Sequence, residues 1–363
     1  MNYRTVICNV STILFFNVYI FGQSADTKIK TFLDDLKSTE FSGAVLVANK
    51  DRITEHRSFG LASKEHGIGN KLDTKFNIAS ITKMITAVGI LQLYESGEVE
   101  LNEPVGKYLP DYPNKVLRDS VTIHQLLTHT SGNNNFYVEN FLVTDKSKYR
   151  TISDFVSLFA NAPLLSRPGT KYDYSASGYV ILGLIIEKVS GKNYYDYLKS
   201  NIFARAEMKN TTELEIDSIV KNKASGYTTL FGEIDYAKKN DYYLSKASPA
   251  GFHYSTVEDL FKFSRALRNG TLLQKETAEL MFTPKVKGYS TNIGYGIDVD
   301  MRYNQIIQGH SGGWYGVRGE LMDFMKDHYT VVILSNMDDN GKTGASMVAD
   351  FFKMLIAGKQ KEK

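Results

Sequence analysis

The sequence has almost no cysteine. The only one is Cys8, near the N-terminus, so one chain cannot form an internal disulfide. If the N-terminal segment is removed, no thiol chemistry is left either. The 363 residues must therefore be held together by their hydrophobic core, which a chain of this length permits. The length also predicts one large two-lobed domain or two domains.

A strong excess of charge of either sign is also lacking. The chain has 43 basic and 40 acidic residues, a net charge of +3, and its only basic tract is the short tail 359–363. This balance gives no electrostatic footprint for a nucleic-acid partner. The seven histidines include no HExxH motif, and His124 and His129 are five residues apart, poorly placed to share a helix face. The sequence thus gives no sign of a metal site.

The only long apolar run at the N-terminus is short for a membrane span. Arg4 is the single charged residue of segment 1–24, an apolar stretch covers Ile13–Phe21, and the small residues Gly22 and Ser24 follow. This pattern is typical of a secretory signal peptide. We therefore expect an exported protein, located in the periplasm, the cell envelope or the medium, with no stable membrane span after cleavage. The alternative is an uncleaved N-terminal anchor.

Strand patterns lie near both ends of the chain and helical patterns lie between them. Two short strands are expected within 41–60 and several more within 294–336, followed by a last helix from Lys342 to Ile356. This order predicts an α+β fold of the α/β sandwich type, an antiparallel sheet flanked by terminal helices with an inserted, mostly helical lobe. We expect one domain over 25–363, whose segments are an α/β lobe at about 25–80 and 250–357 and a helical lobe at about 100–250.

Two serine–lysine pairs share one spacing. Ser80 precedes Lys83 by three residues, and Ser218 precedes Lys221 by three residues. On a helix this spacing brings a hydroxyl and an amine to one face, where a proton can pass between them. Chance matches to such a short pattern are common, so the spacing alone does not choose between the pairs.

The surroundings of the two lysines differ. Lys83 is the only charged residue from Phe76 to Tyr94, and its neighbours are mostly apolar, so we expect it to be buried. Burial and the positive end of a helix dipole both lower the pKa of a lysine and favour its basic, neutral form. Segment 213–223 around the second pair is rich in charge and reads as solvated. The sequence therefore favours Ser80 and Lys83 as a nucleophile and its base.

A serine nucleophile also needs a second proton carrier and a site for the oxyanion. Tyr174 stands just before an apolar helix expected over 175–189 and is the candidate carrier, with Tyr172 as an alternative. For either tyrosine the alternative, which is the more common one, is an ordinary packing role.

The stretch "QGHSGGWYG" over 308–316 is the candidate oxyanion site. Its glycines permit close approach to the backbone, so the N–H groups of Gly313 and Ser80 can hold an oxyanion between them. The alternative is a glycine-rich hairpin without a catalytic role.

These three motifs, Ser80-Ile-Thr-Lys83, Tyr174-Ser175-Ala176 and His310-Ser311-Gly312, have the order of those in penicillin-recognising serine hydrolases. The chain resembles the class C β-lactamase-like branch of the serine β-lactamase and penicillin-binding protein family, which includes D-alanyl-D-alanine carboxypeptidases, D-amino-acid peptidases and esterases. Similar stretches are "LLTHTSG" at 126–132, "PAGFHYSTVEDLFKF" at 249–263 and "VVILSN" at 331–336.

The resemblance implies roles for individual residues. Ser80 would form the acyl-enzyme, Lys83 and Tyr174 would share its proton, and the N–H groups of Ser80 and Gly313 would stabilise the oxyanion. His310, with Ser311, Gly312 and Ala176, would line the substrate site. No cofactor and no metal is implied, and the implied partner is a small molecule or a peptide, such as one derived from the cell wall.

Two positions depart from the family pattern. Ala176 stands where the second motif usually ends in asparagine, and His310 stands where many β-lactamases have lysine. Arg318 is a candidate for the missing positive charge, unless it forms a surface ion pair. These changes favour a peptidase-like or esterase-like hydrolase. Two alternatives stay open: a true β-lactamase, and a non-catalytic module that binds penicillin or senses peptidoglycan.

Overall fold

The structure is a computed structural model that describes residues 24–136, 144–215, 217–228, 238–239, 246–338 and 344–358. Apart from Ser24, the predicted signal segment lies outside these residues. None of the helices in the described ranges is long and apolar enough to cross a membrane.

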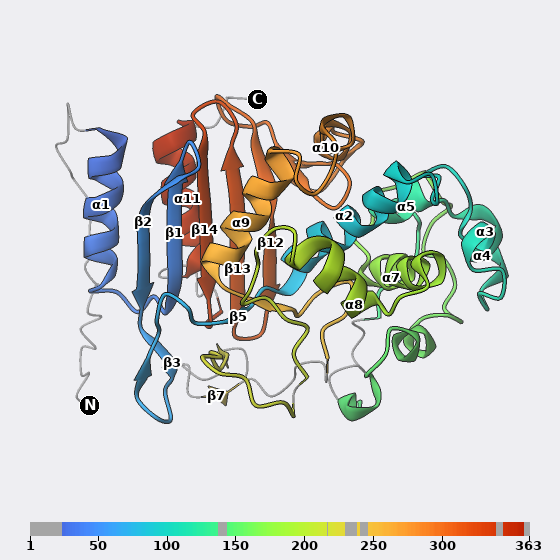
Figure 1. The fold of residues 1–363 in the computed structure, drawn as a ribbon, viewed down its shortest axis with the longest axis horizontal. Helices are drawn as coiled ribbons and strands as arrows, with labels where there is room; N and C mark the ends of the chain where they lie inside the picture. Colours follow the sequence, from blue (N-terminus) through green and yellow to red (C-terminus); the bar gives the residue numbers. More distant parts are fainter. Residues whose placement is uncertain are drawn as a thin grey trace, which may run out of the picture.

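An eight-stranded antiparallel sheet forms the centre of the fold (Figure 1). Across the sheet the strands lie in the order β2-β1-β14-β13-β12-β11-β10-β9. The first two strands of the chain are therefore next to the last one. The strands are β1 (Gly43–Asn49), β2 (Arg52–Phe59), β9 (Val286–Lys287), β10 (Asn292–Ile293), β11 (Asp298–Asp300), β12 (Ile307–Trp314), β13 (Val317–Phe324) and β14 (Tyr329–Ser335).

Both faces of this sheet are covered, and this explains why β1 and β14 contain runs of consecutive apolar residues. In β1, Val45 and Val47 belong to the core on one face, while Leu46 belongs to the core on the other face. In the opposite strand β14, Ile333 pairs with Val45 and Val332 pairs with Leu46. Alternate side chains therefore face different layers, and both layers exclude water.

The two terminal helices cover one face of the sheet. These are α1 (Ala25–Leu36) and α11 (Ala345–Ala357), which meet through the stacked rings of Phe32 and Phe351, 3.7 Å apart. Helix α9 (Val257–Arg268) covers the other face, and Figure 1 shows it in front of the sheet with α11 behind. The predicted α+β fold with flanking terminal helices is confirmed.

The helical segments gather beside the β12 side of the sheet, at the right of Figure 1. They are α2 (Thr82–Glu95), α3 (Val105–Tyr108), α4 (Lys115–Ser120), α5 (Ile123–Leu127), α7 (Ala176–Ser190) and α8 (Tyr194–Leu198), with α10 (Lys275–Phe282) between them and the sheet. Short turns of tighter or wider helix are η1 (Ala79–Ile81), η2 (Lys146–Lys148), η3 (Ser153–Leu158) and η4 (Lys199–Phe203). Short strands are β3 (Leu61–Ser63), β4 (Ile68–Gly69), β5 (Phe76–Asn77), β6 (Tyr227–Thr228), β7 (Lys238–Lys239) and β8 (Tyr254–Ser255).

One continuous hydrophobic core joins these helices to the sheet. It includes Leu46, Leu321 and Leu334 from the sheet and Ile85 and Ile185 from α2 and α7. The helices therefore rest on the sheet rather than folding around a separate core, which fixes the start of α2 against the edge where β12 passes.

Candidate active site

Ser80 lies in η1, directly between the short strand β5 and helix α2. The residue before it, Ala79, has a positive φ of 41°, which is strained for a residue with a side chain. Two contacts hold this conformation: Asn77 Oδ1 accepts the Ala79 N–H at 2.8 Å, and the Phe252 N–H donates to Ala79 O at 3.3 Å. This backbone conformation of Ala79, held by the two hydrogen bonds, sets the direction in which the Ser80 side chain points.

Lys83 is fully buried, one turn after Ser80. Its Nζ lies 3.2 Å from Ser80 Oγ and donates a hydrogen bond of 2.5 Å to Ala250 O. Burial lowers the pKa of Lys83 to about 7, so a large share of the amine is neutral near neutral pH. Because one N–H is directed to Ala250, the neutral amine can offer its lone pair to the Ser80 hydroxyl.

Of the two candidate tyrosines, Tyr174 is the one that lies close to this pair. Lys83 Nζ lies 4.8 Å from the centre of the Tyr174 ring. Burial raises the pKa of Tyr174, although a hydrogen bond with Ser80 opposes this rise. The phenol is therefore protonated at neutral pH and has a proton to donate beside Ser80. Tyr172 and Tyr174 both line a cavity in front of Ser80. The Tyr172 ring packs edge-to-face on Tyr289, with 4.9 Å between the ring centres.

His129, to which the sequence assigned no role in the site, packs directly on Tyr174. The two rings stack at 4.4 Å between centres, and the Ser175 N–H donates to His129 Nδ1 at 3.1 Å. Since Nδ1 accepts this bond, the neutral ring carries its proton on Nε2. Burial lowers the pKa of His129 and keeps it neutral. Its only signal in the sequence was its place in "LLTHTSG".

Strand β12 passes close to Ser80. A Cβ on Gly312 would lie 2.4 Å from Ile78 O and 3.2 Å from Ser80 N, so only glycine fits at this crossing. Next to it, Gly313 lines the same cavity as Ser80. The sequence predicted that another part of the chain comes close to this glycine-rich stretch. In the structure this part is the backbone of Ile78 and Ser80.

The hairpin that follows directs the N–H of Gly313. Trp314 pairs with Val317 across a two-residue turn, and Gly313 pairs with Arg318. In such a hairpin the pair next to the turn is hydrogen-bonded and the following pair is not, so the Gly313 N–H is directed away from β13. On that side, β11 pairs with β12 only as far as Gly309. The Gly313 N–H is thus placed at the edge that faces the cavity.

His310 and Ser311 also line the cavity, which has a volume of about 340 Å³. His310 Nδ1 contacts the carbonyl of Ser311, and burial lowers the pKa of His310, so this position carries no positive charge at neutral pH. Arg318 reaches the cavity but forms an ion pair of 2.9 Å with Glu320, which is almost buried. The pair is therefore not the surface pair considered from the sequence.

Besides the buried Lys83, two of the candidate residues do not line the cavity. Ala176 is fully buried at the first position of α7 and contributes no polar group. Gly312 lies within β12, where its backbone packs closely against Ile78. The second serine–lysine pair is elsewhere: Ser218 and Lys221 are both exposed, as expected for a solvated segment.

The geometry agrees with similarities to known proteins. A family model described as Beta-lactamase matches residues 27–348. The chain belongs to the beta-lactamase family. Within this family, the chain is 33% identical over 321 residues to the putative penicillin-binding protein PbpX of Bacillus subtilis, covering 85% of this chain and 74% of that protein.

Solved structures of the family share the fold. A penicillin-binding protein from Bacillus halodurans superposes with a TM-score of 0.80 at 30% identity, covering 89% of this chain and 99% of that one. A D-amino acid amidase from Ochrobactrum anthropi, solved with D-phenylalanine, has a TM-score of 0.78 at 25% identity, covering 92% and 99%. These similarities support a serine hydrolase of the beta-lactamase family.

Proposed function

We propose that this beta-lactamase family member is an exported serine hydrolase that cleaves an amide or ester bond through an acyl-enzyme on Ser80. The observation that carries the proposal is the buried Lys83 amine, 3.2 Å from Ser80 Oγ, with its pKa lowered to about 7. A hydroxyl is a weak nucleophile until a neighbouring base takes its proton. Lys83 is such a base at neutral pH.

The first half-reaction follows from this arrangement. Lys83 takes the proton of Ser80 as Oγ forms a bond to the substrate carbonyl carbon. The N–H groups of Ser80 and Gly313 stabilise the negative oxygen, and loss of one such donor typically costs about 3–4 kcal/mol. The tetrahedral intermediate then breaks its bond to the leaving amine or alcohol, which receives a proton through Lys83 and Tyr174.

The second half-reaction uses the same groups in reverse. A water molecule gives a proton to the Lys83 and Tyr174 pair, attacks the ester carbonyl and releases the acid, and Ser80 regains its proton. The phenol of Tyr174 is protonated in the resting state because burial raises its pKa. We therefore assign the role of first base to Lys83 and that of proton relay to Tyr174.

The lining of the cavity favours a peptidase-like or esterase-like hydrolase over a β-lactamase. Ala176 offers no amide to a substrate carbonyl, and His310 offers no fixed positive charge to a substrate carboxylate. The similarity to a D-amino acid amidase supports an amide or ester of an amino acid as substrate. Export is proposed from the signal-like pattern of segment 1–24.

The test is a substrate panel of nitrocefin, a D-Ala-D-Ala peptide, D-amino acid amides and short p-nitrophenyl esters. We expect turnover of amides or esters and weak or no turnover of nitrocefin. Ser80→Ala should abolish turnover, whereas Ser218→Ala, a serine of equal spacing in an exposed segment, should leave it unchanged. Efficient nitrocefin turnover would show a true β-lactamase, and acylation without any turnover would show a binding or sensing module.

A further inference from the structure

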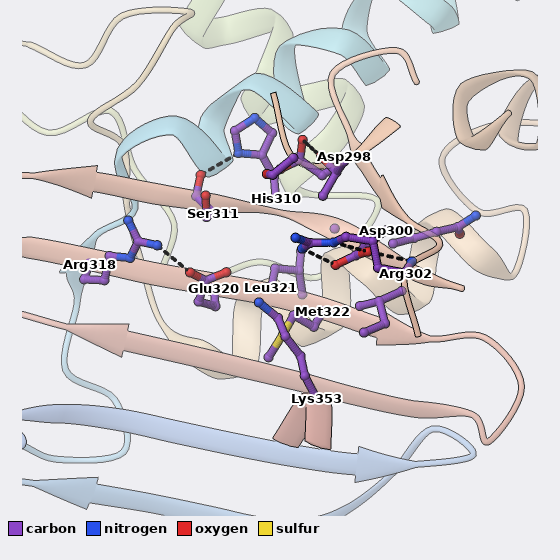
Figure 2. Close-up of a pocket in the computed structure, with 15 residues that line it drawn as sticks. Asp298, Asp300, Arg302, His310, Ser311, Arg318, Glu320, Leu321, Met322 and Lys353 are labelled. Carbon is purple, nitrogen blue, oxygen red and sulfur yellow. Dashed lines mark hydrogen bonds and ion pairs between the residues drawn. The ribbon is translucent and has the colours of Figure 1, made fainter. Parts of the chain in front are cut away.

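The cavity in front of Ser80 continues into a second cavity along β11, β12 and β13, with a volume of about 200 Å³ (Figure 2). The residues that line both cavities are Ser290, Thr291, Asp298, His310, Ser311 and Arg318. A substrate that reacts at Ser80 can therefore extend along the sheet into this second space.

The positive side chains along this path all have carboxylate partners. Figure 2 shows Asp300 joined to Arg302 and Glu320 joined to Arg318, with nitrogen–oxygen distances of 2.7 and 2.9 Å. Lys353, deeper in the second cavity, lies 3.8 Å from a carboxylate oxygen of Asp350 on its own helix. Each positive side chain along the path is thus already matched by a carboxylate.

Asp298 is the exception. It accepts a hydrogen bond of 3.2 Å from Thr291 Oγ1, and within the described residues it has no ion pair. It lies where the two cavities meet, beside His310, as Figure 2 shows. His310 is uncharged at neutral pH because burial lowers its pKa, so it does not balance the carboxylate.

The position of Asp298 relative to Ser80 follows from the strand register. Asp298 pairs with Gly309, three residues along β12 from the glycine that touches Ser80 N. At about 3.3 Å a residue, this separation is roughly 10 Å along the strand. A substrate group held by Asp298 is therefore several bonds from the carbonyl that Ser80 attacks.

We propose that Asp298 selects substrates with a cationic group, such as a primary ammonium, several bonds from the scissile carbonyl. This inference rests on the proposed hydrolase function and names its substrate class. The hydroxyl groups of Ser290, Thr291 and Ser311 line the same space and can accept the remaining ammonium hydrogens. An anionic substrate is disfavoured for two reasons. The guanidinium of Arg318 is already bound to Glu320, and the carboxylate of Asp298 repels a negative charge on the substrate.

The experiment compares three p-nitrophenyl esters of similar length: heptanoate, 6-aminohexanoate and the monoester of adipic acid. They end in a methyl, an ammonium and a carboxylate. We expect kcat/KM for the ammonium ester to exceed that for heptanoate by roughly tenfold or more, as for a charge-assisted hydrogen bond. Asp298→Asn should remove this preference and leave heptanoate turnover within about twofold of the wild-type value.

The matched control is Asp300→Asn, two residues along the same strand, where the carboxylate is paired with Arg302. It should keep the ammonium preference. Equal rates for the ammonium and neutral esters, a preference for the adipate ester, or a slowing of all three esters by Asp298→Asn would overturn the assignment. If heptanoate is hydrolysed in any of these cases, only the inference fails. If no ester is hydrolysed and a fluorophosphonate does not label Ser80, the proposed function fails with it.

Discussion

At the residue scale, the decisive feature is one buried lysine, Lys83, which has no ion pair among the described residues. The sequence predicted the burial of Lys83 because no other charged residue lies between Phe76 and Tyr94, and the structure buries it fully. In the part of the chain that the structure describes, no carboxylate offsets the loss of hydration, so burial lowers the pKa of Lys83. The burial of Lys83 was therefore predictable from the residues around it in the sequence. Its hydrogen bond to Ala250 was not predictable in this way.

The pH dependence of the reaction follows from this lysine. A lysine whose pKa is about 7 is protonated and inactive as a base below that value and neutral above it. We expect kcat/KM for a neutral ester to rise with pH and to reach half its maximum near pH 7. Lys83→Ala should lower kcat by about 10²- to 10⁴-fold, as is usual for loss of a general base. A flat profile from pH 5.5 to 8.5 would show that another group takes the proton.

Other residues of the site could not be predicted, because only the folded chain brings them next to the cavity. His129 and Tyr174 are far apart in the sequence, and only the packing of α7 on α5 stacks their rings. Asp298 meets the cavity only because the register places it opposite Gly309. His129 is marked in the sequence only by its place in "LLTHTSG", and no local pattern marks Asp298.

At the element scale, the strands and helices were predicted better than their ends. The segment STVE at 255–258 has the sequence pattern of a capping box that begins at Ser255, but the cap of α9 is Thr256, whose side chain accepts the Asp259 N–H. Ser255 is instead paired in a short strand with Phe76. The pairing uses the backbone of Ser255 and shifts the helix start by one residue.

A similar override shortens an element in the helical lobe. Segment 153–161 has a helical sequence pattern, but the structure has only the tight turn η3 over Ser153–Leu158. Phe155 of this turn is fully buried against Phe136 and Tyr149. Anchoring of this side chain in the core, rather than helix propensity, sets the local backbone.

The crossing of β12 over η1 gives a test at this scale. Gly312→Ala would bring a Cβ to 2.4 Å from Ile78 O, which forces β12 away from Ser80. We expect a loss of about 1–3 kcal/mol in the free energy of unfolding and a clear fall in the labelling rate of Ser80. Urea denaturation and fluorophosphonate labelling measure the two effects.

The matched control for this change is Gly69→Ala. A Cβ there has its nearest neighbour, Gly60 O, at 3.9 Å, so both stability and labelling should stay close to wild type. Wild-type labelling by Gly312→Ala would mean that the crossing does not position Ser80.

At the scale of the whole molecule, the two predicted lobes share one core. Leu334 of the sheet, Phe263 of α9 and Ile185 of α7 belong to the same buried cluster. A shared core couples the unfolding of its parts, because neither part keeps its buried surface without the other. We therefore propose that residues 25–363 form one cooperative domain.

The single tryptophan allows this to be measured. Trp314 lies on β12 beside the site, while the far-ultraviolet circular dichroism reports mainly the helices. The urea transitions followed by tryptophan fluorescence and by circular dichroism should coincide in midpoint and slope. Separate midpoints would show that the helical lobe unfolds independently of the sheet.

The central claim is that Ser80 becomes a nucleophile because Lys83 is buried beside it. Mass spectrometry of the intact protein and its peptides after treatment with a fluorophosphonate tests this most directly. We expect a single adduct on Ser80 that forms faster as the pH rises through 7, is absent in Ser80→Ala, slows strongly in Lys83→Ala and is unchanged in Ser218→Ala. An adduct on another residue, or full-rate labelling of Ser80 without Lys83, would contradict the account.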